Sequence, residues 1–199
     1  MQNENPTTQK KIFDASVKLF SDLGFARVSM RDIAKSVGIS VAAIYNHFPS
    51  KDSLLDAMYD FFNKQRELYL PDTEAALALC ETAPLPELFS KFVFYYEEGT
   101  RETLDRIVAI AIGESRSDKR SADFINKCLL QLPDSIVIPV LQRLIDIGRI
   151  EPLDLEGIRI LFANYTYAAA VRNYSLIPIG FSDWTKGLQT LLSLVKPKK

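Results

Sequence analysis

The chain has few of the residues on which common catalytic and metal sites depend. Its 199 residues include one histidine, two cysteines and eight glycines, which are scattered singly. A second histidine, a CxxC pair, a GxxxxGK loop and a GxGxxG turn are all absent from the sequence. A Ser-His-Asp or Cys-His site would therefore have to use His47, and no cluster of histidines is available for a metal. We expect no catalytic residues, no bound metal and no cofactor.

Long apolar runs are also absent. The uncharged run from Ile160 to Val171 is too short to cross a bilayer, and the first ten residues are polar, unlike a signal peptide. We therefore expect a cytoplasmic chain with no membrane partner. In that compartment Cys80 and Cys128 are expected to be two buried, reduced thiols.

The net charge of −1 does not by itself indicate a nucleic-acid partner. The local balance differs, because one stretch, 25–51, has four basic residues and a single acid, Asp32. The only histidine of the chain lies in the same stretch. This small basic patch on a nearly neutral protein is typical of a surface that meets an anionic partner. Its basic residues are Arg27, Arg31, Lys35 and Lys51.

Apolar residues recur at helical spacing along almost the whole chain, which predicts an all-α fold. The first helix is expected between Pro6 and Gly24, the second after the cap Ser29, and the third after the cap Ser40. Pro49 ends the third helix, and a fourth runs from Lys51 toward Pro71. Further helices are expected near 73–81, 86–98, 101–115, 120–132, 134–147, 154–174 and 183–195.

The second and third helices are separated by only Val37-Gly38-Ile39-Ser40, and glycine can adopt the positive φ of a sharp corner. This spacing predicts a helix-turn-helix whose third helix enters the major groove of DNA. Ile44 and Phe48 are expected to face the core, which leaves the intervening side chains exposed. Use of the same unit for protein contacts alone is the alternative.

Residues from about Thr7 to Leu55 resemble the DNA-binding domain of the TetR family of transcriptional regulators. The similar segments read "LFSDLGF", "SMRDIAKSVGIS" and "AAIYNHFPSKDSLL", and Asn46 stands where the family more often has an aromatic residue. The resemblance implies a DNA-binding domain over 6–66 and an effector-binding and dimerisation domain over 67–199. It implies DNA contacts at Ser29, Met30, Arg31, Ser40, Val41, Ala42, Ala43, Tyr45, Asn46, His47 and Lys51. The alternative for Tyr45 and His47 is a purely structural role, and the alternative for Arg31 and Lys35 is a solvated helix face.

The second domain is predicted from its apolar residues, because the family resemblance fades after Pro71. Residues 88–96 form a segment that is apolar on nearly every side, which indicates core packing. The alternative is a cavity for a small, largely hydrophobic effector. Its candidate residues are Phe92, Tyr95, Tyr96, Arg106, Phe124, Asn164 and Tyr165.

A single reading helix contacts few bases, so we expect a two-fold homodimer on a palindromic operator. The helices near 134–147 and 154–174 are the candidate dimer surface, with burial inside one subunit as the alternative. The sequence thus predicts a ligand-responsive DNA-binding regulator that represses transcription until its effector releases it. A protein partner in place of the effector, or a helical enzyme or adaptor with the same fold, are the alternatives.

Overall fold

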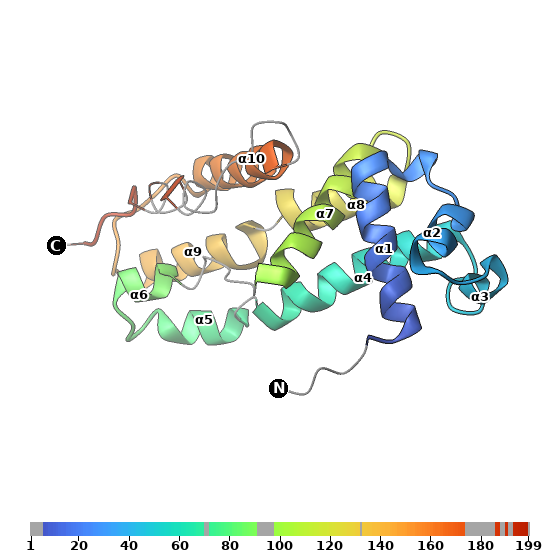
Figure 1. Ribbon diagram of the computed structural model, residues 1–199. Helices are drawn as coiled ribbons and strands as arrows, with labels where there is room; N and C mark the ends of the chain where they lie inside the picture. Colours follow the sequence, from blue (N-terminus) through green and yellow to red (C-terminus); the bar gives the residue numbers. More distant parts are fainter. Residues whose placement is uncertain are drawn as a thin grey trace. The chain divides into compact units, whose positions relative to one another are not determined.

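In the computed structural model, the described residues are 6–69, 72–90, 98–131, 133–173, 186, 187, 190 and 193–198. These residues are helical apart from the connections and one isolated bridge between Ile150 and Pro197 (Figure 1). The predicted all-α class is confirmed. The predicted helix near 183–195 lies mostly outside the described residues.

The first three helices form where their end signals predict them. Helix α1 spans Thr8–Leu23 and is capped by the Thr7 hydroxyl, α2 spans Met30–Val37, and α3 spans Val41–Tyr45. A short 3-10 helix, Phe25–Arg27, joins α1 to α2. The third helix ends at Tyr45, and the chain turns at Asn46 and His47 before it reaches Pro49.

Helix α4, Lys51–Tyr69, packs with the first three helices around one core. Its side chains Leu54, Leu55 and Met58 are fully buried, as are Ile12 of α1, Ile33 of α2 and Ile44 of α3. Burial of several such side chains, each contributing on the order of 2 kcal/mol, fixes α2 and α3 against the longer helices. The apolar spacing in the sequence therefore marks this core correctly.

The chain divides into two compact units, and the first also includes residues distant in sequence. The first unit consists of Met1–Gln65 and Glu97–Ala122. The second unit consists of Arg66–Tyr96 and Asp123–Lys199. Helix α7, Glu98–Glu114, belongs to the first unit because it packs on α1. The predicted domains over 6–66 and 67–199 stay a prediction, and the compact units differ from them in placing 97–122 with the N-terminal residues.

The second unit is built from short helices around an apolar core. Its helices are α5 (Thr73–Leu79), α6 (Leu85–Ser90), α9 (Ile138–Asp146) and α10 (Leu155–Asn173). Helix α8, Lys119–Ile125, continues into a π-helical turn, Asn126–Leu130, and a second such turn, Pro133–Val137, precedes α9. The core includes Leu88, Ile136, Val140, Leu141, Leu144 and Phe162.

One stretch of the second half, 119–146, is long and apolar enough to cross a membrane by length and composition alone. The sequence analysis overlooked it because it contains charged residues. Its side chains Ile136, Val140, Leu141 and Leu144 are almost completely buried in the core of the second unit. A core helix of a soluble protein passes the same test, so this stretch is weak evidence for a membrane span.

Candidate nucleic-acid interface

The corner between α2 and α3 has the geometry that a helix-turn-helix requires. Gly38 lies in the left-handed region with φ 75°, and its backbone N–H donates to the carbonyls of Ala34 and Lys35. The Ser40 hydroxyl then accepts from the backbone N–H of Ala43, 3.1 Å away, and so caps α3. A glycine tolerates this φ without the strain that a side chain would bring. The turn therefore follows from local sequence alone.

The start of α2 is fixed by a reciprocal capping box. The backbone N–H of Asp32 donates to the Ser29 hydroxyl, while the backbone N–H and the hydroxyl of Ser29 donate to the Asp32 carboxylate at 2.8 and 2.6 Å. The side-chain and backbone hydrogen bonds from Ser29 hold the pKa of Asp32 below its usual value. Asp32 therefore remains an anion engaged with its own helix, although it lies within the basic patch.

Most of the predicted contact residues of α3 are accessible. Ile44 and Phe48 are buried, as expected, whereas Tyr45 is 49% exposed and Asn46 and His47 are also exposed. Ser40 and Ala42 are exposed, and Val41 and Ala43 are half-buried. The exposed face thus combines small side chains with hydrogen-bonding side chains, which suits close approach to a groove.

Two predicted contact residues have structural roles in the fold. The side chain of Met30 is 8% exposed and belongs to the core, which leaves only its main chain at the N-terminus of α2 for a contact. The Nζ of Lys51 donates to the carbonyls of Phe25 and Val28 at 2.8 and 3.0 Å, and lies 4.2 Å from the centre of the Phe25 ring. Lys51 therefore holds the connection between α1 and α2 in place.

Comparison with known proteins identifies this arrangement. Residues 12–58, which cover α1 to α3 and the start of α4, match the family model described as "Bacterial regulatory proteins, tetR family". The matched region is thus a TetR-type DNA-binding domain.

Curated relatives match over part of the chain. The nucleoid occlusion factor SlmA of Marinobacter nauticus is 38% identical over 61 residues, which are 31% of each chain. The HTH-type transcriptional regulator UidR of Escherichia coli strain K12 is 38% identical over 78 residues, 39% of this chain and 35% of UidR. IcaR of Staphylococcus aureus strain Newman, a negative regulator of the biofilm operon icaADBC, is 27% identical over 61% of this chain and 78% of its own. The matches to SlmA and UidR span about a third of those proteins.

Solved structures of TetR regulators share the fold over nearly the whole chain. The ketosteroid regulator KstR2 of Mycobacterium tuberculosis has a TM-score of 0.61 at 19% identity, covering 97% of each chain. A regulator from Saccharomonospora viridis, solved with choline, has a TM-score of 0.63 at 15% identity, covering 96% of this chain and 98% of that one. At such identities the likeness establishes the fold and no more.

The predicted effector residues are divided between the two units. Phe92, Tyr95 and Tyr96 lie outside the described residues. In the second unit Phe124 is buried and Tyr165 is half-buried, while the exposed Asn164 donates to the Ile160 carbonyl of its own helix. These residues remain predictions as an effector site.

Arg106 belongs to the first unit and has a structural role there. Its Nη1 donates to Ser21 Oγ and Asp22 Oδ1 of α1, each at 2.7 Å, and its Nε and Nη2 donate to Glu102 on its own helix. These bonds hold the pKa of the Asp22 carboxyl below its usual value. Arg106 thus connects α7 to α1, which its place in the sequence does not reveal.

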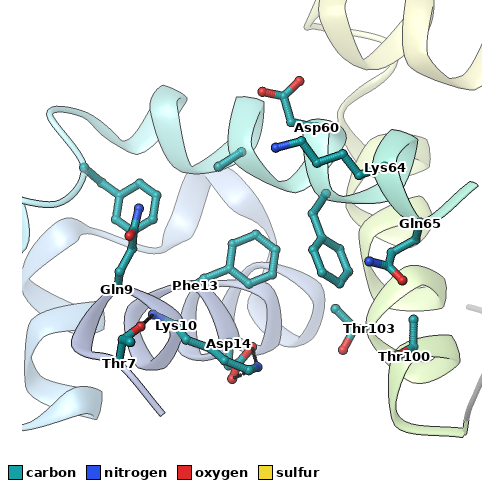
Figure 2. Close-up of a pocket in the computed structure, with 13 residues that line it drawn as sticks. Thr7, Gln9, Lys10, Phe13, Asp14, Asp60, Lys64, Gln65, Thr100 and Thr103 are labelled. Atoms are coloured by element: carbon teal, nitrogen blue, oxygen red, sulfur yellow. Dashed lines mark hydrogen bonds and ion pairs between the residues drawn. The ribbon is translucent and has the colours of Figure 1, made fainter. Parts of the chain in front are cut away.

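A groove of about 630 Å³ lies within the first unit, between α1, α4 and α7. Figure 2 shows Lys10 and Asp14 of α1 on one side, Asp60 and Lys64 of α4 on the other, and Phe13 between them. Phe13 packs against Phe61 with ring centres 5.3 Å apart. Lys10 and Asp14 pair with each other at 2.7 Å. The groove is open and of mixed charge, and it contains none of the predicted effector residues.

Proposed function

We propose that this protein is a DNA-binding transcriptional repressor of the TetR type. The observation that carries the proposal is the exposed face of α3, set at a glycine corner beside α2 and flanked by the exposed cations Arg27, Arg31 and Lys35. Small and hydrogen-bonding side chains on a short exposed helix suit base-edge readout, and surrounding cations suit phosphates. The sequence matches to UidR and IcaR support this proposal.

The proposal is tested by binding of the purified protein to labelled DNA from upstream of its own gene, against a scrambled duplex, over a salt series. We expect saturable preference for the natural fragment and a steep loss of affinity as salt rises. Tyr45→Ala is expected to weaken specific binding about tenfold or more, equivalent to one good contact. Equal binding of both duplexes by the wild-type protein at every salt concentration would contradict the proposal.

We further propose that a small effector, largely hydrophobic, binds in the second unit and acts through α4. This helix is continuous from Lys51 in the first unit to Tyr69, and its residues from Arg66 onward belong to the second. An effector that binds one conformation of the second unit more tightly shifts the population toward that conformation. Helix α4 transmits the change because it is continuous. Phe92, Tyr95, Tyr96, Phe124, Asn164 and Tyr165 are the proposed lining.

Arg66 is a further candidate that the sequence analysis missed. Its Nε is buried and has no hydrogen-bond partner among the residues that the structure describes. Burial raises the pKa of the Cys128 thiol to about 11, and the charges of Arg66 and Lys127 oppose that rise, so the guanidinium acts on a buried thiol. A buried donor without a partner destabilises the fold unless a ligand or water completes it. We therefore propose that Arg66 meets an anionic or hydrogen-bond-accepting group of the effector.

Arg66→Met is expected to raise the free energy of unfolding by about 1 kcal/mol or more, because methionine removes a buried donor with no partner. Chemical denaturation of the full chain measures this difference. Lys127→Met is the matched control, since Lys127 is an exposed cation near the same thiol, and it is expected to leave the stability within about 0.5 kcal/mol. A clear loss of stability in Arg66→Met would show that the guanidinium is satisfied within the protein and would contradict its proposed role.

We propose a homodimer that associates through α10. This helix carries an exposed stripe at i, i+1, i+4, i+8 and i+11, where Ile160, Leu161 and Val171 are 46%, 51% and 37% exposed. Asn164 and Ala168 complete the stripe. The apolar residues of the other predicted helix, 134–147, are mostly buried in the core of their own subunit, so the alternative of internal burial holds for them. The dimer proposal therefore rests on α10.

Leu161→Glu is expected to weaken self-association at least about tenfold, because it places a charge in an apolar interface. Sedimentation equilibrium over a concentration series measures the dimer dissociation constant. Gln142→Glu adds the same charge at an exposed position of α9 and is expected to leave this constant unchanged. If Leu161→Glu dimerises as tightly as the wild type and Gln142→Glu, α10 is not part of the dimer interface.

A second candidate function has one observation in its favour. The relative SlmA is named a nucleoid occlusion factor rather than a transcriptional regulator, and it is 38% identical to this chain over 61 residues, as UidR is over 78 residues. A TetR-type DNA-binding protein gated by a protein partner fits this match equally well. Release of the operator by a small molecule, with no other protein present, would favour the effector-released repressor over the protein-gated alternative.

A further inference from the structure

A series of polar contacts connects the start of α8 to the start of α4. The Arg120 guanidinium donates to Asp52 Oδ1 at 2.7 Å and to Asp56 Oδ1 at 3.0 Å, both in the first two turns of α4. It also donates to Asp118 Oδ2 at 2.6 Å, just before α8 begins, which holds the pKa of Asp118 below its usual value. One side chain thus bridges three carboxylates, a geometry for which the planar guanidinium is suited.

The next residue of α8 makes a buried contact with the same face of α4. The hydroxyls of Ser121 and Tyr59 lie 2.7 Å apart, and both side chains are buried. Burial raises the pKa of Tyr59 to about 12, so the phenol stays protonated. Asp52, Asp56 and Tyr59 are spaced i, i+4 and i+7 and therefore share one face of the helix. Two consecutive residues of α8 hold this face.

The first turn of α4 is also attached to the helix-turn-helix. Lys51, the first residue of α4, donates from its Nζ to the carbonyls of Phe25 and Val28. Val28 directly precedes Ser29, which caps α2. Contacts therefore run from Arg120 to Asp52, along the backbone to Lys51, and on to the residues that enter α2. We call Arg120, Asp52, Asp56 and Lys51 the polar relay.

The polar relay lies where the chain passes from one compact unit to the other. The first unit ends at Ala122 and the second resumes at Asp123, within the single helix α8, Lys119–Ile125. Arg120 is thus two residues from the boundary on a continuous helix. A rotation or shift of α8 imposed from the second unit moves the guanidinium that holds the start of α4.

We propose that Arg120 is a positioning residue for DNA binding, which sets the start of α4, and through Lys51 the helix-turn-helix, without itself touching DNA. This inference rests on the proposed function. The Arg120 side chain is 40% exposed, and it restricts the first turn of α4 more than an isolated surface ion pair does, because three carboxylates share it. Its loss leaves α2 and α3 less preorganised for the groove.

The DNA arm of the test compares Arg120→Met with Arg116→Met, which removes an exposed arginine from the turn before α8. Arg120→Met is expected to weaken operator binding about threefold to thirtyfold with an unchanged salt slope, and Arg116→Met to leave the affinity within about twofold. Arg120→Lys is expected to recover part of the loss, since lysine retains the charge but not the fork. A salt slope lowered by about one in Arg120→Met would show a direct phosphate contact and overturn the proposal.

A second arm needs no DNA and separates this proposal from the proposed function. Amide hydrogen exchange of the free protein in residues 25–48 is expected to be about threefold faster or more in Arg120→Met than in Arg116→Met. Ser121→Ala, compared with Ser117→Ala, is expected to act in the same direction with no change of charge. If exchange in Arg120→Met is faster while the wild type binds no DNA, the relay stands and the proposed function fails. Unchanged exchange in 25–48 would overturn the relay.

Discussion

Lys51→Met is expected to reduce operator affinity by about a hundredfold and to lower the free energy of unfolding by about 2 kcal/mol. The ammonium satisfies the carbonyls of Phe25 and Val28, so methionine leaves both without this donor. The connection that precedes α2 then loses its attachment to α4, and the phosphate contact implied for Lys51 is lost as well. Denaturation and DNA titration of the same preparation measure the two effects.

The matched control is Lys64→Met, an exposed lysine near the end of the same helix. Lys64 has the same charge and the same aliphatic side chain as Lys51, but it lies two turns or more of α4 away from the helix-turn-helix. It is expected to keep the wild-type stability within about 0.5 kcal/mol. If Lys51→Met unfolds at the wild-type denaturant concentration, the contacts of Lys51 with the two carbonyls do not support the fold.

Leu141→Ala is expected to lower the free energy of unfolding by about 2–5 kcal/mol. Leu141 is fully buried in the core of the second unit, with Val140 and Leu144 beside it on α9. Truncation removes apolar contact area and leaves a cavity among close-packed side chains. Because the cores of the two units are separate, faster amide exchange is expected mainly in 73–90 and 133–173.

Leu68→Ala is the control for Leu141→Ala, since it deletes the same atoms from a side chain that is 74% exposed. It is expected to change the stability by less than about 0.5 kcal/mol. Equal stabilities for the two variants would show that 119–146 does not form a core. That outcome would favour an apolar surface, including the membrane span that the stretch resembles by length and composition.

The first half of the fold was predictable because its signals are local. Ser29 with Asp32, Gly38 and Ser40 each fix one helix end within three or four residues, and the structure has those ends in place, whereas the third helix ends before it reaches Pro49. Local rules of this kind need no knowledge of distant contacts. The same reasoning placed Ile44 and Phe48 in the core and left Tyr45 exposed.

Long-range contacts were not predictable in this way. Arg106 meets Asp22 across 84 positions, and Arg120 meets Asp52 across 68, so no periodicity in the sequence connects them. Arg106 was interpreted as a polar group of a cavity, and Arg120 was not singled out. The π-helical turns at 126–130 and 133–137 also lack a simple pattern, because helical spacing alone does not distinguish them from α-helix.

The most direct test of the central claim is selection of bound sequences from a random double-stranded DNA pool by the full-length wild-type chain. We expect enrichment of a two-fold symmetric sequence whose half-sites are about one helical turn apart, or a multiple of it, as a dimer with two reading helices requires. The Tyr45→Ala variant is expected to lose that enrichment. A pool that stays random after repeated selection by the wild-type protein at low salt would contradict sequence-specific DNA binding.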